Sequence, residues 1–182
     1  MREEVAHILF STEDIQKKIK ELGARISSDY QGKNLILIGV LKGAMFFMAD
    51  LMRQVSIPVI IDFIGISSYG ESSKSSGAVR IIKDIEENID NKPVLVVEDI
   101  VDTGLTMNYL LKTLRLRKPS SIKICVLIDK KGRRMQNIPL DYVGFEVENQ
   151  HVVGFGLDYR DRYRHLPYLC TLKESLPQVR IP

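Results

Sequence analysis

Residues 94–106 read VLVVEDIVDTGLT, and this stretch decides the fold. The four apolar residues 94–97 predict a strand that is buried on both faces and ends at Glu98 and Asp99. From Met107 onward, apolar residues recur at helical spacing. The stretch therefore predicts a strand, a short loop and a helix, with the loop at the carboxyl end of the strand. Open α/β sheets bind their ligands at that end.

The loop carries groups that suit a phosphate. Thr103, Gly104 and Thr106 stand at the start of the helix, where free backbone N–H groups, hydroxyls and the positive end of the helix dipole attract an anion. Threonine and aspartate also cap helices that bind nothing, and a lone Asp-x-Gly after a strand means little. Because the strand and the helix both agree with the motif, the sequence favours a phosphate site.

Three acids accompany this anion site. Glu98 and Asp99 would repel a phosphate, so we expect them to accept hydrogen bonds from sugar hydroxyls or to bind a divalent cation. Asp102 lies between the acidic pair and the anion site, within reach of the reactive carbon of a sugar. The combination predicts a phosphorylated ribose with a metal ion nearby.

At this point the sequence resembles a known family. Residues 94–106 are similar to the phosphoribosyl pyrophosphate signature of the type I phosphoribosyltransferases, and the EDIVDTG form is closest to the hypoxanthine-guanine branch. The resemblance implies an α/β fold with a mostly parallel twisted sheet flanked by helices. It also implies one domain, residues 1–182, with a small base-binding hood formed by the N-terminal and C-terminal segments.

The resemblance also implies a reaction. Ribose 5-phosphate would pass from phosphoribosyl pyrophosphate to hypoxanthine or guanine, giving IMP or GMP plus pyrophosphate, with Mg²⁺ as cofactor. Asp102 would be the general base that takes the imidazole proton of the purine. Ribose and the 5-phosphate would be bound by Glu98, Asp99, Asp102, Thr103, Gly104, Leu105 and Thr106. Relatives often carry a basic residue at the position of Leu105, which affects a side-chain contact but not the backbone donors.

A second strand, residues 34–40, leads through Leu41, Lys42 and Gly43 into a helix predicted over 44–53. Taken alone, a glycine turn with a solvated lysine is the simpler interpretation. In the family the matching turn binds pyrophosphate through backbone N–H groups and a non-proline cis peptide. By resemblance these three residues bind pyrophosphate, as does Arg164.

A strand predicted over 59–66 leads into the Ser- and Gly-rich residues 67–77. Composition alone fits a flexible surface linker. The family has a mobile loop here whose Ser-Tyr pair closes over the reaction centre, and Ser68 and Tyr69 match it. The resemblance thus implies a lid that keeps water from a cationic sugar transition state.

The purine site is expected beyond the strand predicted over 122–128. The basic run after that strand fits a solvated loop, but Lys130 aligns with the family lysine that donates to the purine O6 and so selects 6-oxopurines over adenine. Residues 151–168 resemble the hood, where Val152 would read the base edge through its backbone. Asp158 would lie at the base site and, with Glu98 and Asp99, would bind metal.

His151 departs from the family pattern, because relatives more often carry phenylalanine there to stack on the purine. Imidazole stacks with less area and can protonate near neutral pH. A surface turn residue is the other interpretation of His151.

The remaining patterns predict ordinary elements. A first helix over 11–30 starts with a possible capping box of Ser11 and Asp14, a strand covers 79–82, and 142–147 and 152–157 form a final pair of strands. Two cysteines in 182 residues make no disulfide framework, and no stretch reads as a signal peptide or membrane span. We therefore expect a soluble cytoplasmic protein.

Several alternatives remain open at this stage. The enzyme could prefer xanthine or adenine, although Lys130 argues against adenine. A regulatory protein that keeps the fold and binds RNA or DNA is a rival, but a net charge of +3 is not the profile of a nucleic-acid binder. We expect small-molecule substrates, no membrane partner and, from the family, a homodimer or homotetramer.

Overall fold

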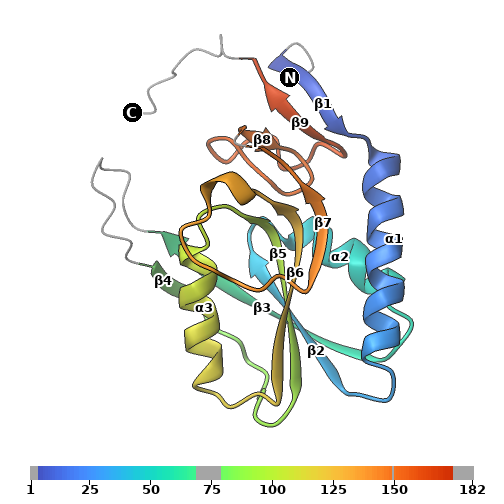
Figure 1. Ribbon diagram of the computed structural model, residues 1–182, viewed down its shortest axis with the longest axis vertical. Helices are drawn as coiled ribbons and strands as arrows, with labels where there is room; N and C mark the ends of the chain where they lie inside the picture. The colour runs from blue at the N-terminus through green and yellow to red at the C-terminus, as the bar shows by residue number, and fades with distance from the viewer. Residues whose placement is uncertain (1–3, 69–78, 149, 174–182) are drawn as a thin grey trace.

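The computed structural model describes residues 4–68, 79–148 and 150–173 (Figure 1). Its elements, in chain order, are β1 (Val5–Phe10), α1 (Thr12–Asp29), β2 (Leu35–Leu41), α2 (Met45–Gln54), β3 (Val59–Ser68), β4 (Val79–Lys83), β5 (Pro93–Val101), α3 (Leu105–Arg115), β6 (Ser121–Asp129), the 3₁₀ turn η2 (Lys131–Arg133), β7 (Tyr142–Glu146), β8 (Val152–Val153) and β9 (Leu169–Leu172).

The larger sheet has six strands in the order β4-β3-β2-β5-β6-β7. The pairs β2–β3, β2–β5, β5–β6 and β6–β7 are parallel, and only β4 runs antiparallel to its neighbour. Side chains alternate across the sheet: Leu35 and Leu37 belong to one core cluster and Ile36 and Ile38 to the other. The predicted α/β fold with a mostly parallel sheet is confirmed.

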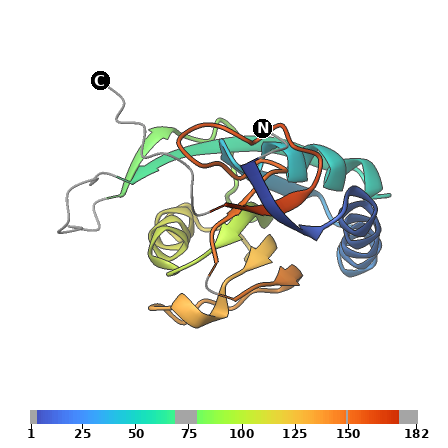
Figure 2. The ribbon, with the colours of Figure 1, turned by 90° about the horizontal axis from the view of Figure 1, so that it is seen from above.

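Helices cover both faces of this sheet. Helices α1 and α2 pack in the first cluster, whereas α3 packs in the second, and Figure 2 shows α1 and α3 on opposite sides of the strands. The predicted capping box starts α1: Ser11 Oγ accepts from Asp14 N at 3.1 Å, and Asp14 Oδ2 accepts from Ser11 N at 3.0 Å. Within the described ranges, no helix is long and apolar enough to cross a membrane.

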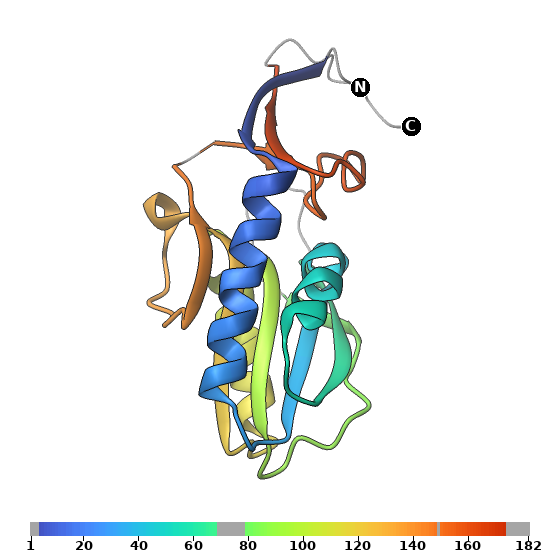
Figure 3. The same ribbon diagram turned by 90° about the vertical axis from the view of Figure 1, so that its right-hand side faces the viewer.

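A second, three-stranded sheet of order β1-β9-β8 lies above the carboxyl ends of the main strands (Figures 1 and 3). It joins the two ends of the described chain, since Val5 pairs with Leu172. The strand predicted over 142–147 is confirmed as β7, but it pairs with β6 in the main sheet and not with the strand predicted after it. Of 152–157 only Val152 and Val153 form a strand, and they pair with β9.

The direction in which successive strands are added to the sheet reverses at its centre, between β2 and β5. Strand β2 is followed by α2 and then by β3 on one side, whereas β5 is followed by α3 and then by β6 on the other. The connections that leave the carboxyl ends of β2 and β5 therefore run to opposite sides of the sheet, which leaves a crevice between them. Ligands of open α/β sheets bind at such a switch point.

Candidate active site

A cavity of about 380 Å³ lies at this switch point. It is lined by most of the residues singled out in the sequence: Leu41, Gly43, Glu98, Asp99, Asp102, Thr103, Gly104, Thr106 and Asp158. These residues come from the end of β2, the end of β5, the start of α3 and the hood. The apolar side chains of Val40, Ile66 and Met107 form part of its walls. The fold thus brings three distant segments to one cavity.

The acidic pair lies within β5, not beyond it as expected. The strand continues to Val101 because its pairing with β6 continues, through Glu98 opposite Val126 and Ile100 opposite Ile128. Its pairing with β2 has already ended at Val97. The acids therefore stand on a strand edge that has lost one neighbour, and their carboxylates line the cavity.

Glu98 and Asp99 are 8% and 9% exposed. Burial and the neighbouring Asp99 carboxylate raise the pKa of Glu98 well above its usual range. Burial also raises the pKa of Asp99, although Arg164 acts in the opposite direction. Gly43 permits the position of Asp99, since a Cβ at residue 43 would stand 1.7 Å from Asp99 Oδ2. Burial thus disfavours the charged form of both carboxylates.

The loop after β5 forms an open helix N-terminus. Gly104 is the N-cap of α3 and adopts a φ of 82°, which favours glycine. It provides no side-chain cap, and the first turn of α3 contains no acid. Leu105 N lies 3.4 Å from Thr103 Oγ1, a long hydrogen bond. The terminus is therefore suited to an anion.

Asp102 faces two cations from the segment after β6. Its Oδ2 accepts a hydrogen bond from Arg133 Nη1 at 3.2 Å and lies 4.0 Å from Lys130 Nζ. Its Oδ1 is buried and has no hydrogen-bond partner in the structure. Lys130 is 6% exposed, and burial lowers its pKa against the opposing effect of Asp102. The structure thus places Lys130 beside Asp102.

The hood loop approaches the turn after β2. Arg164 Nη2 lies 2.7 Å from Asp158 Oδ1, and Arg164 Nη1 donates to the Gly156 carbonyl at 2.7 Å. Asp161 Oδ1 is 3.3 Å from both Arg164 Nη2 and Lys42 Nζ. The Leu41–Lys42 peptide is cis. Ion pairs therefore connect the two segments assigned to pyrophosphate.

Several expected residues lie outside the cavity lining. His151 is exposed and its ring contacts Tyr159 edge-on, with centroids 5.4 Å apart. Val152 is buried in β8, and Leu105 is 38% exposed. Ser68 is the last residue of β3, and Tyr69 lies outside the described residues, so the lid stays a prediction.

Sequence reasoning missed Arg133 and Asp161 as partners of site residues. Arg133 belongs to a basic run whose composition indicates a solvated loop. Asp161 stands among alternating charges in the hood with no motif of its own. Their contacts depend on how loops meet in space, which no local pattern encodes.

The acidic side chains of the cavity meet part of what a metal ion needs. Within the described part of the chain, no group of three or more His, Cys, Asp or Glu side chains is arranged to hold a metal. Mg²⁺ typically takes only one or two carboxylates together with phosphate oxygens of its substrate. The two buried carboxylates of Glu98 and Asp99 fit that pattern. Asp158 fits less well, since it already pairs with Arg164 and accepts from Asp161 N at 2.8 Å.

The model of the phosphoribosyl transferase domain matches residues 7–160. The chain belongs to the phosphoribosyltransferase family. Within it, its relatives are the hypoxanthine-guanine enzymes. The hypoxanthine-guanine phosphoribosyltransferase of Bacillus subtilis is 49% identical over 176 residues, 97% of this chain and 98% of the relative. That of Streptococcus thermophilus is 47% identical, with the same coverage. A hypoxanthine phosphoribosyltransferase structure from Staphylococcus aureus superposes with a TM-score of 0.91 at 46% identity, covering 95% of this chain and 94% of that one.

Proposed function

We propose that the chain transfers ribose 5-phosphate from phosphoribosyl pyrophosphate to hypoxanthine or guanine and thereby salvages purines as IMP or GMP. The observation that carries this proposal is the single cavity lined by an acidic pair, an open helix N-terminus and the turn after β2. The relatives named hypoxanthine-guanine phosphoribosyltransferase support it over nearly their whole length.

The 5-phosphate of the donor binds at the start of α3. The backbone N–H groups after Gly104 and the hydroxyls of Thr103 and Thr106 surround it there, and the helix dipole favours its charge. Leu105 contributes its backbone rather than its side chain. The absence of an acid from the first turn of α3 supports this assignment.

Glu98 and Asp99 bind the ribose hydroxyls and Mg²⁺. When bound, Mg²⁺ would neutralise the charge of the leaving pyrophosphate. A cation beside the two carboxylates would also relieve the unfavourable burial that raises their pKa values. Asp158 contributes to the metal and base sites from the hood.

Leu41, Lys42, Gly43 and Arg164 bind the pyrophosphate. Backbone groups of the turn and the guanidinium of Arg164 would contact its oxygens. Lys42 and Arg164 both pair with Asp161 in the structure. Pyrophosphate carries more charge than that carboxylate and would compete for both cations. Ser68 and Tyr69 would close over the reaction centre and exclude water.

Asp102 takes the imidazole proton of the purine as the new bond to the sugar forms. Lys130 donates to the exocyclic O6, and its place 4.0 Å from Asp102 suits a purine that spans both groups. His151 stacks on the base, and the backbone of Val152 reads its edge. The carboxylates around the sugar also stabilise the cationic charge that develops on it.

We also propose a cytoplasmic homodimer or homotetramer. Exposed apolar residues on the α2 side of the sheet, Met45 of α2 and Ile61 of β3, support an interface with a second copy. The buried, unpaired Cys125 and Cys170 agree with a reducing compartment. Sedimentation velocity over a range of concentrations tests the assembly. A monomer throughout would contradict it.

The function is tested by a spectrophotometric assay with phosphoribosyl pyrophosphate and Mg²⁺ against hypoxanthine, guanine, xanthine and adenine. Turnover of hypoxanthine or guanine, but not of adenine, is expected. Xanthine turnover would show a wider base pocket. If the donor binds and no base reacts, the enzymatic proposal is wrong, and RNA binding should then be measured.

A further inference from the structure

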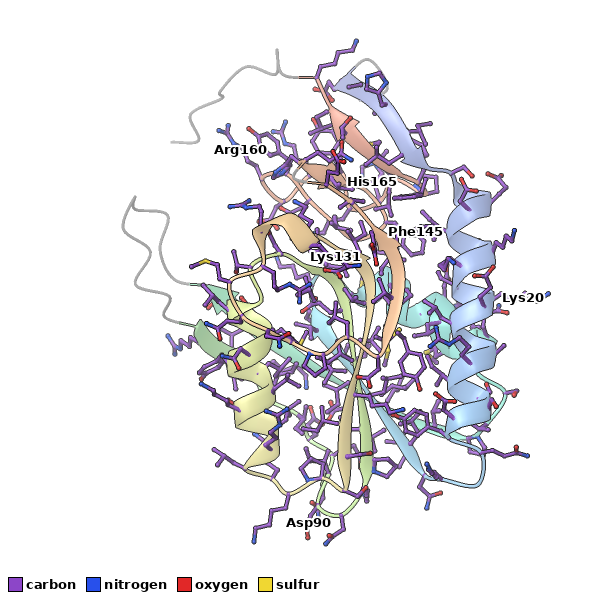
Figure 4. The ribbon with its side chains drawn as sticks, in the orientation of Figure 1. Lys20, Asp90, Lys131, Phe145, Arg160 and His165 are labelled. Carbon is purple, nitrogen blue, oxygen red and sulfur yellow. The ribbon has the colours of Figure 1, made fainter. Side chains whose placement is uncertain are left out.

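The segment after β6 supplies the cations nearest to the phosphate loop. Residues 130–134 read KKGRR, whereas the loop 102–106 reads DTGLT and has no cationic side chain. The segment lies against the loop, because Met135 N and Gln136 N both donate to Thr103 O, at 2.9 and 3.2 Å. Figure 4 labels Lys131 on this turn, close to the upper end of the sheet.

Each of the four cations pairs with an acid in the structure. Lys131 pairs with Glu146 at 2.5 Å, and Arg134 pairs with Asp129 although its side chain packs beside Gly104. Lys130 is buried beside Asp102. Of the four, only Arg133 combines an exposed side chain, at 50%, with the proposed general base Asp102 as its partner.

This pair occupies the oxygen of Asp102 that the site can use. Asp102 Oδ1 is buried and has no hydrogen-bond partner, so the exposed 33% of the side chain belongs to its other atoms. Arg133 Nη1 donates to Oδ2 at 3.2 Å. A purine N–H that approaches Asp102 would therefore meet an oxygen already bound to a guanidinium.

A phosphate bound in the loop would compete for Arg133. A phosphate monoester carries a charge of about −1.5 to −2 at neutral pH, more than a carboxylate. The planar guanidinium fork matches phosphate geometry. An exposed ion pair contributes little stability, so Arg133 can leave Asp102 at small cost. Gly132 beside it has open space around it, which leaves the turn free to adjust.

We propose that Arg133 is a positioning residue that pairs with Asp102 in the ligand-free chain and transfers to the 5-phosphate when a phosphorylated ribose binds. The transfer completes the phosphate site, whose loop has no cation of its own. It also frees the Asp102 oxygen for the purine only when the sugar phosphate is present. The inference rests on the proposed function, since it uses the same loop and the same general base.

The test compares two ligands that differ only in the 5-phosphate, inosine 5′-monophosphate and inosine, by calorimetric titration. In Arg133→Gln the affinity for the nucleotide should fall about 10- to 100-fold, as expected for a charge-assisted hydrogen bond. The affinity for the nucleoside should stay the same or rise, because no ion pair on Asp102 has to be broken. Arg133→Lys should restore part of the nucleotide affinity.

Lys131→Gln is the matched control, because it removes the same charge from the same turn on the side that pairs with Glu146. It should change neither affinity. An Arg133→Gln variant that weakens both ligands alike, or neither, would overturn the inference. A wild-type protein that binds the nucleotide but turns over no 6-oxopurine would contradict the proposed catalysis instead, and the ratio of the two affinities would still decide the role of Arg133.

Discussion

The α-carbon of Gly43 lies so close to the carboxylate of Asp99 that a Cβ at residue 43 would stand 1.7 Å from Oδ2. The turn after β2 and the acidic pair on β5 are thus fitted to each other, although Gly43 and Asp99 are 56 positions apart in sequence. The two strands meet at the switch point of the sheet. Their contact fixes where the acids can point.

Gly43→Ala should therefore damage donor binding more than folding. The new methyl group would force the buried Asp99 carboxylate out of position and displace the metal and ribose groups. We expect the KM for phosphoribosyl pyrophosphate to rise at least about tenfold, a loss of roughly one charge-assisted hydrogen bond. Gly132→Ala is the control, since a Cβ there meets nothing within 4 Å. Equal kinetics in the two variants would disprove the link between Gly43 and Asp99.

Glu98 should make the stability of the ligand-free chain depend on pH. Its pKa is raised by folding, so the stabilising protonated state is fully present below the usual value of 4.5 and is lost as pH rises through the folded-state value. Glu98→Gln removes this titration. At pH 7 without metal the variant should melt a few degrees higher than wild type, since a shift of one pKa unit corresponds to about 1.4 kcal/mol.

The same variant reports on the metal. Mg²⁺ with pyrophosphate should raise the melting temperature of wild type more than that of Glu98→Gln, because a ligand stabilises the state that binds it. Melting curves at pH 5 and pH 8, with and without both ligands, provide the comparison. If the melting temperature of wild type depends on pH no more than that of Glu98→Gln, the pKa of Glu98 is not raised by folding.

Lys130 should control the choice of base. Lys130→Met keeps the side-chain length in a buried site but removes the donor expected to face O6. Turnover of hypoxanthine should fall about 10- to 100-fold, and the ratio of hypoxanthine turnover to adenine turnover should fall with it. Lys123→Met removes a lysine from the opposite end of β6, where it pairs loosely with Asp29, and should leave the ratio unchanged. An unaltered ratio in Lys130→Met would remove this lysine from base selection.

The elements of the main sheet could be predicted because each is marked locally. Four consecutive apolar residues predicted β5, and Gly104 with its flanking threonines indicated the start of α3. The hood could not be assembled in this way. Strand β1 pairs with β9, which lies at the other end of the described chain, and β8 has only two residues, Val152 and Val153. Neither fact leaves a periodic pattern in sequence.

The residues of the candidate site likewise fall into those marked by a local motif and those placed only by tertiary packing. Residues that belong to a strand–loop–helix unit, such as Asp102 and Thr106, were predicted from their motif, and both line the cavity. Arg133 and Asp161 were not, because they act through ion pairs between loops whose meeting depends on the packed sheet. The end of β5 was placed too early for a related reason. Acids usually interrupt strands, but here pairing with β6 carries the strand past Glu98.

The most direct test of the account is the effect of Asp102→Asn on turnover of hypoxanthine, measured together with the affinity for phosphoribosyl pyrophosphate. Asparagine keeps the size of the side chain but cannot take the purine proton. The kcat should fall about 100- to 10,000-fold while the donor still binds. A kcat close to that of wild type, in a variant that binds the donor normally, would contradict the assignment of Asp102 as the proton acceptor.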